Sequence, residues 1–158
     1  MPPKALVDLR EIDLDRIEFG PEEIRRCNPH RYEMELLNGI IAYRPDEGFI
    51  VGEHRAAPDA FWVRGHIPGR PLFPGVLMVE AAAQLCSFYW RHLFPDHPSF
   101  FGFGGIENTR FRGVVAPGDR LVIVGKSVEV KPRRAIFDAQ GWVEGKMVFE
   151  TRIIGIPF

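Results

Sequence analysis

The chain has few cysteines and no long uninterrupted apolar segment. Only Cys27 and Cys86 occur among its 158 residues, far apart and without a CxxC spacing, so we expect free thiols, with Cys86 packed as a small apolar residue. Residues 1–10 contain no apolar run of signal-peptide length. The longest apolar segment includes Glu80 and Gln84 and is too short and too polar to span a bilayer. The sequence therefore predicts a cytoplasmic protein without a membrane segment.

The chain also lacks a strong net charge, with 20 Lys and Arg against 21 Asp and Glu. The charges are unevenly spread, because residues 1–60 hold 8 Lys and Arg against 13 Asp and Glu, whereas residues 110–134 hold 7 against 2. Such a basic segment can attract an acidic partner or a phosphate group, and it is equally typical of a solvated strand face. Since the whole chain is not basic and its aromatics do not alternate with charges, we expect no nucleic-acid partner.

A chain of this length, with 46% apolar and 26% charged residues, is typical of one soluble globular domain. We expect a single domain over residues 1–158, in which residues 1–21 form an N-terminal arm that ends in a turn at Gly20-Pro21. The next segment, Pro21 to Cys27, predicts a short helix, because a proline and two acidic residues occupy its first turn.

Strand-forming segments separated by Pro and Gly turn signals make up much of the remaining chain. They cover residues 34–43, 49–54, 100–111, 120–130, 135–143 and 146–154. The short breaks between them predict antiparallel neighbours. In residues 121–130 the side chains alternate between the two faces of the strand, and both faces begin with apolar residues. We therefore expect one end of this strand to be covered on both faces. Together with an apolar helix from Gly75 to Trp90, the pattern predicts an α+β fold with one long central helix and an antiparallel sheet of about six strands.

Glu80 is the most informative residue, because the helix around it is otherwise almost wholly apolar. Taking a carboxylate out of water costs several kcal/mol unless a partner or a function requires it there. Glu80, Gln84 and Ser87 fall at i, i+4 and i+7, which places them in one stripe along the helix. We expect this stripe to line a polar site. A second interpretation, in which Glu80 and Gln84 only form hydrogen bonds inside a packed core, stays open, and Ser87 is more typical of a structural role.

The segment that precedes this helix contains His66 and three prolines, which make a stiff loop. Histidine is the side chain that most readily exchanges a proton near neutral pH, which makes His66 a candidate acid or base. The helix start at Gly75 presents unpaired N–H groups to an oxygen that gains negative charge, and a glycine lets a ligand approach the backbone. The other four histidines show no constellation of partners around them, and we predict no metal site, because carboxylate or thiol ligands are not evident beside them. These four are His30, His54, His92 and His97.

Residues 65–84, GHIPGRPLFPGVLMVEAAAQ, resemble the active-site segment of the FabZ-type 3-hydroxyacyl-(acyl carrier protein) dehydratases. Residues 29–32, PHRY, resemble the N-terminal motif of that family, and residues 103–112 and 115–119 are similar to its later strand and turn. The resemblance covers roughly residues 22–154. It implies a hotdog fold, in which the sheet wraps the long helix, two subunits pair edge to edge, and dimers assemble into hexamers as trimers of dimers.

The activity that the resemblance implies is dehydration of 3-hydroxyacyl thioesters on acyl carrier protein to trans-2-enoyl thioesters in fatty acid biosynthesis, without a cofactor. His66 of one subunit would face Glu80 of the other and remove the C2 proton, while Glu80 would be protonated or hold a water and so assist departure of the 3-hydroxyl. The Gly75 N–H would stabilise the enolate-like oxygen, and Gln84 would orient Glu80. We expect burial to raise the pKa of Glu80, as suits a general acid.

The resemblance also implies an acyl tunnel and a docking surface for the acidic acyl carrier protein. We assign the tunnel to Phe101, Phe103, Ile67 and Val76, and the docking surface to Arg110, Arg112, Arg133 and Arg134. Two features depart from the family: Ile67 stands where Phe is usual, and residues 33–39 replace a more apolar stretch. Two alternatives stay open, namely a hotdog thioesterase in which Glu80 activates water, and a non-catalytic acyl-thioester binding module.

Overall fold

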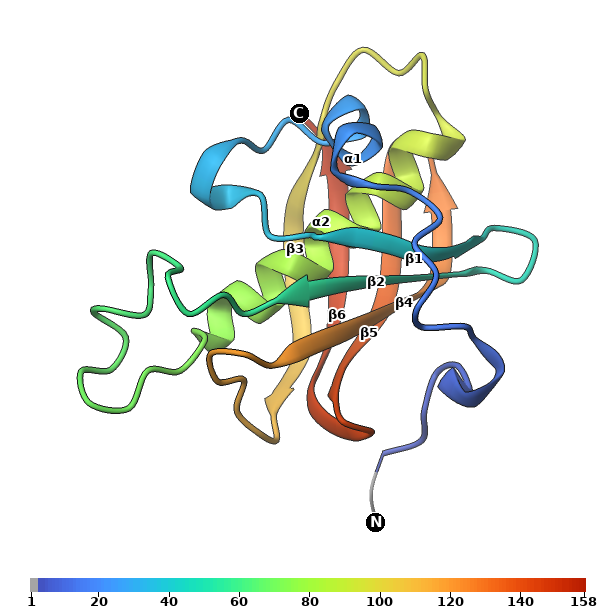
Figure 1. The fold of residues 1–158 in the computed structure, drawn as a ribbon. Helices are drawn as coiled ribbons and strands as arrows, with labels where there is room; N and C mark the ends of the chain where they lie inside the picture. The colour runs from blue at the N-terminus through green and yellow to red at the C-terminus, as the bar shows by residue number, and fades with distance from the viewer. Residues whose placement is uncertain (1–2) are drawn as a thin grey trace.

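The computed structural model of the protein describes residues 3–158. One long helix, α2 (Gly75–Leu93), packs on one face of a six-stranded antiparallel sheet, as the sequence predicted (Figure 1). The spatial order of the strands is β1-β2-β4-β5-β6-β3. The strands are β1 (Gly39–Arg44), β2 (Phe49–Arg55), β3 (Phe101–Phe111), β4 (Arg120–Lys131), β5 (Arg134–Val143) and β6 (Lys146–Pro157).

Helix α2 begins at Gly75, as expected, and ends three residues beyond the predicted Trp90. Arg91 and His92 in its last turn lie at the negative end of the helix dipole, which favours this extension. Most of its apolar residues are buried against the sheet, including Phe88 and Trp90, both 0% exposed. Burying side chains of this size stabilises the fold by roughly 1.5–3 kcal/mol each before entropy is counted, so the helix is held by its packing.

Two predictions about the strands are wrong. Strand β1 begins at Gly39 instead of residue 34, because Tyr32–Met34 form a 3-10 turn, η2, that precedes it. Strand β3 pairs with β6 and not with β4, the next strand in the chain. After β3 the chain stays beside β6, where the N–H groups of Arg112 and Gly113 donate to the Val148 carbonyl, and it then crosses to the other side of the sheet. The break between β3 and β4 is therefore a crossover and not a tight turn.

The N-terminal arm contacts both faces of the sheet: its residues 6–14 lie on the face opposite α2, and Phe19 near its end packs against Phe88 of α2. It includes a 3-10 turn, η1 (Leu9–Glu11), and leads into the short helix α1 (Pro21–Cys27), whose predicted bounds are confirmed. Apolar side chains of the arm pack on β1, β2 and β4, which confirms that β4 is covered on both faces at one end. The contacting residues are Leu6, Val7, Leu9, Ile12 and Leu14 on the arm, and Ile41, Ala42, Phe49, Val51, Val122 and Val124 on the sheet.

Both cysteines are free, and Cys86 is fully buried in the core, as predicted. Burial raises the pKa of the Cys86 thiol far above its ordinary value, so that it packs as a neutral side chain. Within residues 3–158, none of the helices is both long enough and apolar enough to cross a membrane.

Candidate active site

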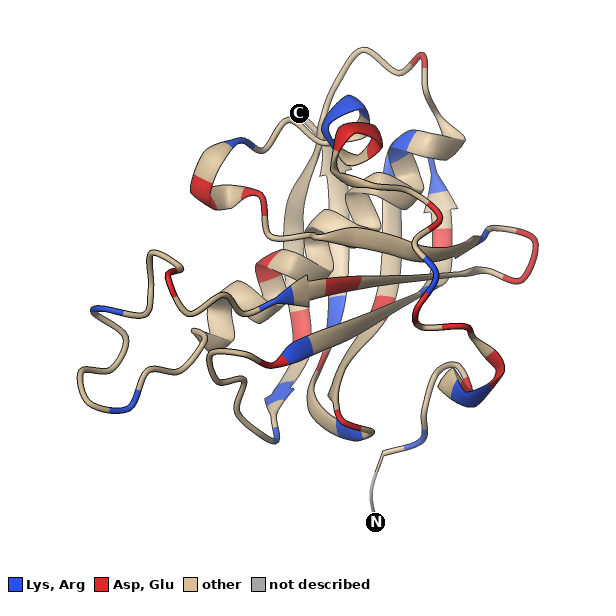
Figure 2. Cartoon of the chain, viewed as in Figure 1, with Lys and Arg blue, Asp and Glu red and all other residues tan. Residues whose placement is uncertain are grey.

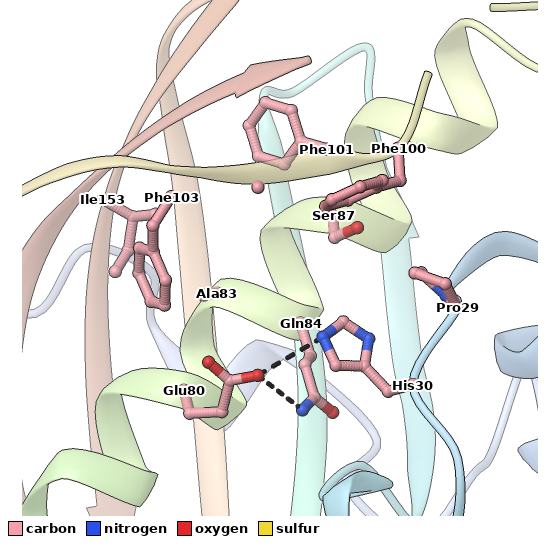
Figure 3. Close-up of a pocket in the computed structure, with 11 residues that line it drawn as sticks. Pro29, His30, Glu80, Ala83, Gln84, Ser87, Phe100, Phe101, Phe103 and Ile153 are labelled. Carbon is pink, nitrogen blue, oxygen red and sulfur yellow. Dashed lines mark hydrogen bonds and ion pairs between the residues drawn. The ribbon is translucent and has the colours of Figure 1, made fainter. Parts of the chain in front are cut away.

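The polar stripe of α2 lines a cavity of about 220 Å³ between the helix, β3 and the loop before η2 (Figure 3). Glu80, Gln84 and Ser87 all face this cavity, as the spacing of the stripe predicted. The remaining wall is mostly apolar and is contributed by Pro29, His30, Ala83, Phe100, Phe101, Gly102, Phe103 and Ile153. The site thus places one carboxylate at the wall of a mostly apolar cavity.

The Glu80 carboxylate is held through one of its two oxygens. The Gln84 amide nitrogen donates a 2.9 Å hydrogen bond to Glu80 Oε1, and His30 Nε2 lies 3.3 Å from the same oxygen (Figure 3). In the described part of the chain, no side chain or backbone group donates to Glu80 Oε2. That oxygen is left to accept a hydrogen bond from a bound molecule.

Gln84 is itself fixed on both sides of its amide. Its nitrogen also donates to the Met34 carbonyl at 2.7 Å, and its oxygen accepts from the Leu36 N–H at 3.1 Å. Gln84 is 2% exposed, so these bonds satisfy a buried amide and leave little freedom for rotation. The predicted contact of Gln84 with Glu80 is therefore present, and its anchor is the chain around η2.

His30 is the site residue that the sequence analysis missed, because it was expected to have no partners. Three bonds fix its loop: the Asn28 side chain donates to the Gln84 carbonyl at 2.9 Å, and one guanidinium nitrogen of Arg31 donates to the carbonyls of Asn28 and His30 at 2.9 and 2.7 Å. The only signal in the sequence was the PHRY segment, whose likeness to a family motif carried no role for the histidine. Its partner on α2 lies 50 residues away in the chain.

The electrostatics of Glu80 differ from the expectation. Burial acts to raise the pKa of this carboxyl, but the hydrogen bonds from His30 and Gln84 and the charge of His30 outweigh burial, and the net pKa lies below its ordinary value of 4.5. The prediction of a raised pKa is therefore wrong for the chain as described. Glu80 favours its charged form.

His66 lies on the exposed loop between β2 and α2 and does not line the cavity around Glu80. Its Nδ1 is 2.8 Å from the Leu72 carbonyl oxygen, and the same two residues are joined by a backbone bond of 2.9 Å. A carbonyl only accepts, so Nδ1 carries the proton and the Nε2 lone pair is left to act as a base. The tautomer suits proton abstraction, but among residues 3–158 no carboxylate is paired with His66.

In the described chain, the first turn of α2 has backbone N–H groups without backbone acceptors, as expected of a helix start. In this turn the Leu77 N–H is the first that donates to a backbone carbonyl, that of Pro74. Within residues 3–158, the N–H groups of Gly75 and Val76 have no backbone acceptor. A side-chain carbon added at Gly75 would lie 2.9 Å from the Phe111 ring. The Phe111 ring at the end of β3 therefore lies against Gly75, and a larger residue here would require this ring to move.

The four predicted tunnel residues divide into two groups. Phe101 and Phe103 line the cavity beside Glu80, with Phe101 buried. Ile67 and Val76 are 52% and 74% exposed and lie outside its lining. Their assignment to the tunnel stays a prediction, since both side chains are exposed on the surface of this chain.

The four predicted docking arginines do not form one surface within the chain. Arg110 is the penultimate residue of β3 and Arg112 follows its end, on either side of Phe111, which contacts the start of α2. Arg133 and Arg134 lie at the β4–β5 turn. That turn is at the opposite end of α2, because the Trp90 indole donates to the Lys131 carbonyl. Lys and Arg accordingly occur at both ends of the sheet in Figure 2. Arg112 is paired with Glu150 at 2.8 Å and Arg134 with Glu129 at 2.9 Å.

Sequence comparison relates the chain to known dehydratases. Residues 28–152 match the model of the FabA-like domain. The 3-hydroxyacyl-(acyl-carrier-protein) dehydratase FabZ of Ehrlichia chaffeensis is 31% identical over 140 residues, which are 89% of this chain and 96% of that protein. The bifunctional enzyme LpxC/FabZ of Chlorobaculum tepidum is 34% identical over 139 residues. The match covers 86% of this chain and 29% of that enzyme.

Structure comparison gives the same architecture. The dehydratase heterocomplex ApeI:P of Xenorhabdus doucetiae superposes with a TM-score of 0.73 at 17% identity, over 85% of this chain and 90% of that one. A hypothetical thioesterase of Streptococcus pneumoniae, solved with coenzyme A, gives a TM-score of 0.57 at 12% identity, over 75% of this chain and 84% of that one. At such identities these structures share the fold with this chain, and its chemistry must be argued from the site.

Proposed function

The chain belongs to the FabA-like family, and we infer that it is a 3-hydroxyacyl-(acyl carrier protein) dehydratase that forms trans-2-enoyl thioesters in fatty acid biosynthesis. The observation that carries this function is the Glu80 carboxylate, held through one oxygen by two partners at the wall of an apolar cavity. The apolar lining suits an acyl chain, and Glu80 Oε2 is left to bind the 3-hydroxyl group of that chain.

The proposed chemistry divides the work between two residues. His66 Nε2 removes a proton from C2, the electron pair of that C–H bond forms the C2=C3 double bond, and the C3–O bond breaks. Because its partners favour the charged form of Glu80, this carboxylate accepts a hydrogen bond from the 3-hydroxyl and orients it. The imidazolium of His66 then gives its proton to the departing oxygen, which leaves as water, so both residues return to their starting states.

The thioester carbonyl gains negative charge when C2 loses its proton. We assign its stabilisation to the Gly75 N–H, which lies at the start of α2 without a backbone acceptor within the described residues. The tight packing of Phe111 on Gly75 holds this part of the helix in place. No metal or cofactor enters the proposed reaction.

We propose that the working unit is a homodimer in which His66 of one chain meets Glu80 of the other. Two observations support this: among the described residues His66 does not line the cavity that contains Glu80, and β3 is an 11-residue edge strand with exposed apolar residues. Phe103, Ile106 and Phe111 on this strand are 39%, 49% and 51% exposed. A long apolar edge pairs readily with another strand, and β3 of a second copy is its proposed partner. Dimers then assemble into a hexamer, which the mass in solution tests.

The acyl carrier protein is the proposed donor of the substrate. Arg110 and Arg112 are exposed and lie next to the start of α2, so they are the stronger candidates for its docking. Arg133 and Arg134 at the far end of α2 stay predictions. Substituting each pair by Ser and measuring KM for a carrier-bound substrate separates the two: we expect KM to rise for the Arg110 and Arg112 pair.

Dehydration of a 3-hydroxybutyryl thioester, and hydration of the crotonyl thioester in reverse, test the function directly. We expect wild-type activity that falls about a hundredfold or more in His66→Ala and in Glu80→Gln, the range for loss of an acid–base group. A thiol reagent in the same assay separates the thioesterase alternative, because dehydration releases no thiol. Wild-type inactivity on acyl chains of every length, or release of free thiol, would contradict the proposal.

A further inference from the structure

His30 has a structural role that neither the reaction nor the core explains. It is partly buried at the cavity wall, 25% of its side chain is exposed, and its Nε2 faces Glu80 Oε1 at 3.3 Å (Figure 3). Its other ring nitrogen, Nδ1, is buried without a hydrogen-bond partner among residues 3–158. A polar atom buried in this way costs free energy, so the contact with Glu80 must offset that cost or serve the site.

The loop that carries His30 is tied to the same helix as Glu80. Asn28 donates to the backbone carbonyl of Gln84, and Gln84 in turn donates to Glu80. Arg31 closes the loop on itself through the Asn28 and His30 carbonyls. Movement of the His30 backbone away from Glu80 has to break these bonds, so they hold the loop in place beside α2.

The surroundings leave His30 as the one titratable group beside Glu80 in the described chain. The β3 and β6 side of the cavity presents Phe101, Phe103 and Ile153, which carry no charge. On the other side of His30, a smaller pocket contains Arg25 and Glu35, and these two are bonded to each other at 2.7 and 2.9 Å. Because these two opposite charges lie side by side, their combined electrostatic effect on Glu80 is small.

We propose that His30 is a positioning residue for Glu80: with Gln84 it occupies Oε1, so that the carboxylate stays charged and directs Oε2 at the 3-hydroxyl of the substrate. This inference rests on the dehydratase function proposed above and adds a third residue to its machinery. It agrees with the lowered pKa of Glu80, for which the His30 hydrogen bond is the largest cause acting against burial. His30 itself forms no bond to the reacting atoms.

Two substitutions separate positioning from packing. His30→Leu fills a similar space without an N–H donor, whereas His30→Gln keeps a donor of similar reach. We expect kcat of His30→Leu to fall about tenfold to a hundredfold, as for loss of one hydrogen bond to a charged group, with KM little changed and most of kcat retained in His30→Gln. The acid limb of the pH profile should move to higher pH in His30→Leu, because Glu80 then loses its charge more easily.

A measurement that needs no turnover tests the inference independently of the function. The ¹³C shift of the Glu80 side-chain carboxyl, assigned with Glu80→Gln, is followed against pH in the wild type, His30→Leu and His30→Gln. We expect the Glu80 titration to move to higher pH in His30→Leu and to move less in His30→Gln. His92→Gln, an exposed histidine near the end of α2, is the matched control and should leave both the titration and kcat unchanged.

The outcomes are distinguishable. An inactive wild type contradicts the dehydratase, and the ¹³C titration then still decides whether His30 controls Glu80. An active wild type with an identical Glu80 titration and an identical pH profile in His30→Leu overturns the role of His30 alone. If His30→Leu does not fold, the same comparison rests on His30→Gln, in which an unmoved titration together with a large loss of kcat overturns the inference.

Discussion

The ring of Phe101 on β3 lies directly over Gly155 on β6, at the wall of the cavity that contains Glu80. A methyl group at position 155 would overlap this ring, and the next strand, β5, pairs with Gly155 on the other side through Ala135. The shape of the proposed acyl site therefore depends on a glycine that does not line it.

Replacing Gly155 by Ala should displace the Phe101 ring toward the cavity. We expect the unfolding free energy to fall by about 1–3 kcal/mol, as for overpacking of a core, and KM to rise more for long acyl chains than for short ones. Thermal unfolding and KM across a series of chain lengths check this. Gly65→Ala is the stability control, because nothing lies within 4 Å of a side-chain carbon there. Equal melting temperatures for the two variants would show that the Phe101 ring moves freely.

Mixing two inactive variants tests the shared site. His66→Ala and Glu80→Gln homodimers each lack one half of every site, whereas a mixed dimer restores one complete site from the His66 of one chain and the Glu80 of the other. After subunit exchange at equal amounts, we expect about a quarter of wild-type activity, since half of the dimers are mixed and each has one intact site. Activity that stays at the level of the separate variants would place His66 and Glu80 in the same chain's site.

His54 should make the protein less stable in acid. Burial lowers the pKa of His54 below its ordinary value of 6.5, and the hydrogen bond to the Leu36 carbonyl offsets this only in part. Below pH 6.5 the unfolded chain therefore binds a proton at this imidazole that the folded chain does not bind. The contribution of neutral His54 to the free energy of unfolding is fully present above pH 6.5. It is lost as the pH falls below that value, by up to about 1.4 kcal/mol per pH unit. His54→Asn keeps a donor for Leu36 and removes the titration.

Urea unfolding at pH 7.5 and pH 5.5 measures this difference. We expect the wild type to lose more stability than His54→Asn between the two values, with His92→Asn, an exposed histidine, as the control for a general effect of losing one imidazole. Identical pH dependence in the wild type and His54→Asn would contradict the assignment.

We expect Arg120 to contribute to the stability of the fold and not to substrate binding. Its guanidinium contacts Glu53, whose side chain is 4% exposed, and also the Leu14 carbonyl of the N-terminal arm. Arg120→Leu leaves Glu53 buried with Arg55 as its remaining partner, so we expect a loss of about 3 kcal/mol in chemical unfolding. Adding Glu53→Gln should recover part of this loss.

The surface pair Arg134 and Glu129 is the control for that experiment. Arg134→Leu removes an exposed ion pair and should change the unfolding free energy by less than about 1 kcal/mol. If Arg120→Leu and Arg134→Leu reduced the free energy of unfolding by similar amounts, the burial of Glu53 would not increase the cost of losing its partner.

The sequence by itself determined most of the helices and strands and the polar stripe on α2. The apolar segment after Pro74 placed the start of α2 at Gly75. The 3.6-residue repeat of the helix put Glu80, Gln84 and Ser87 on one face, because it fixes which positions share a side. Local turn chemistry likewise marked α1 and most strand ends, since Pro and Gly act on their immediate neighbours. Family motifs indicated the reaction, and the matching relatives bear this out.

Only the tertiary structure decided what lies beside those side chains. The pairing of β3 with β6, the contact of His30 with Glu80 and the lowered pKa of Glu80 all depend on residues that are far apart in the chain. A hydrogen bond and a charge act over a few ångströms in space, and the sequence carries no measure of that distance. The carboxylate could therefore be found from its apolar neighbours on the helix, but its protonation state could not.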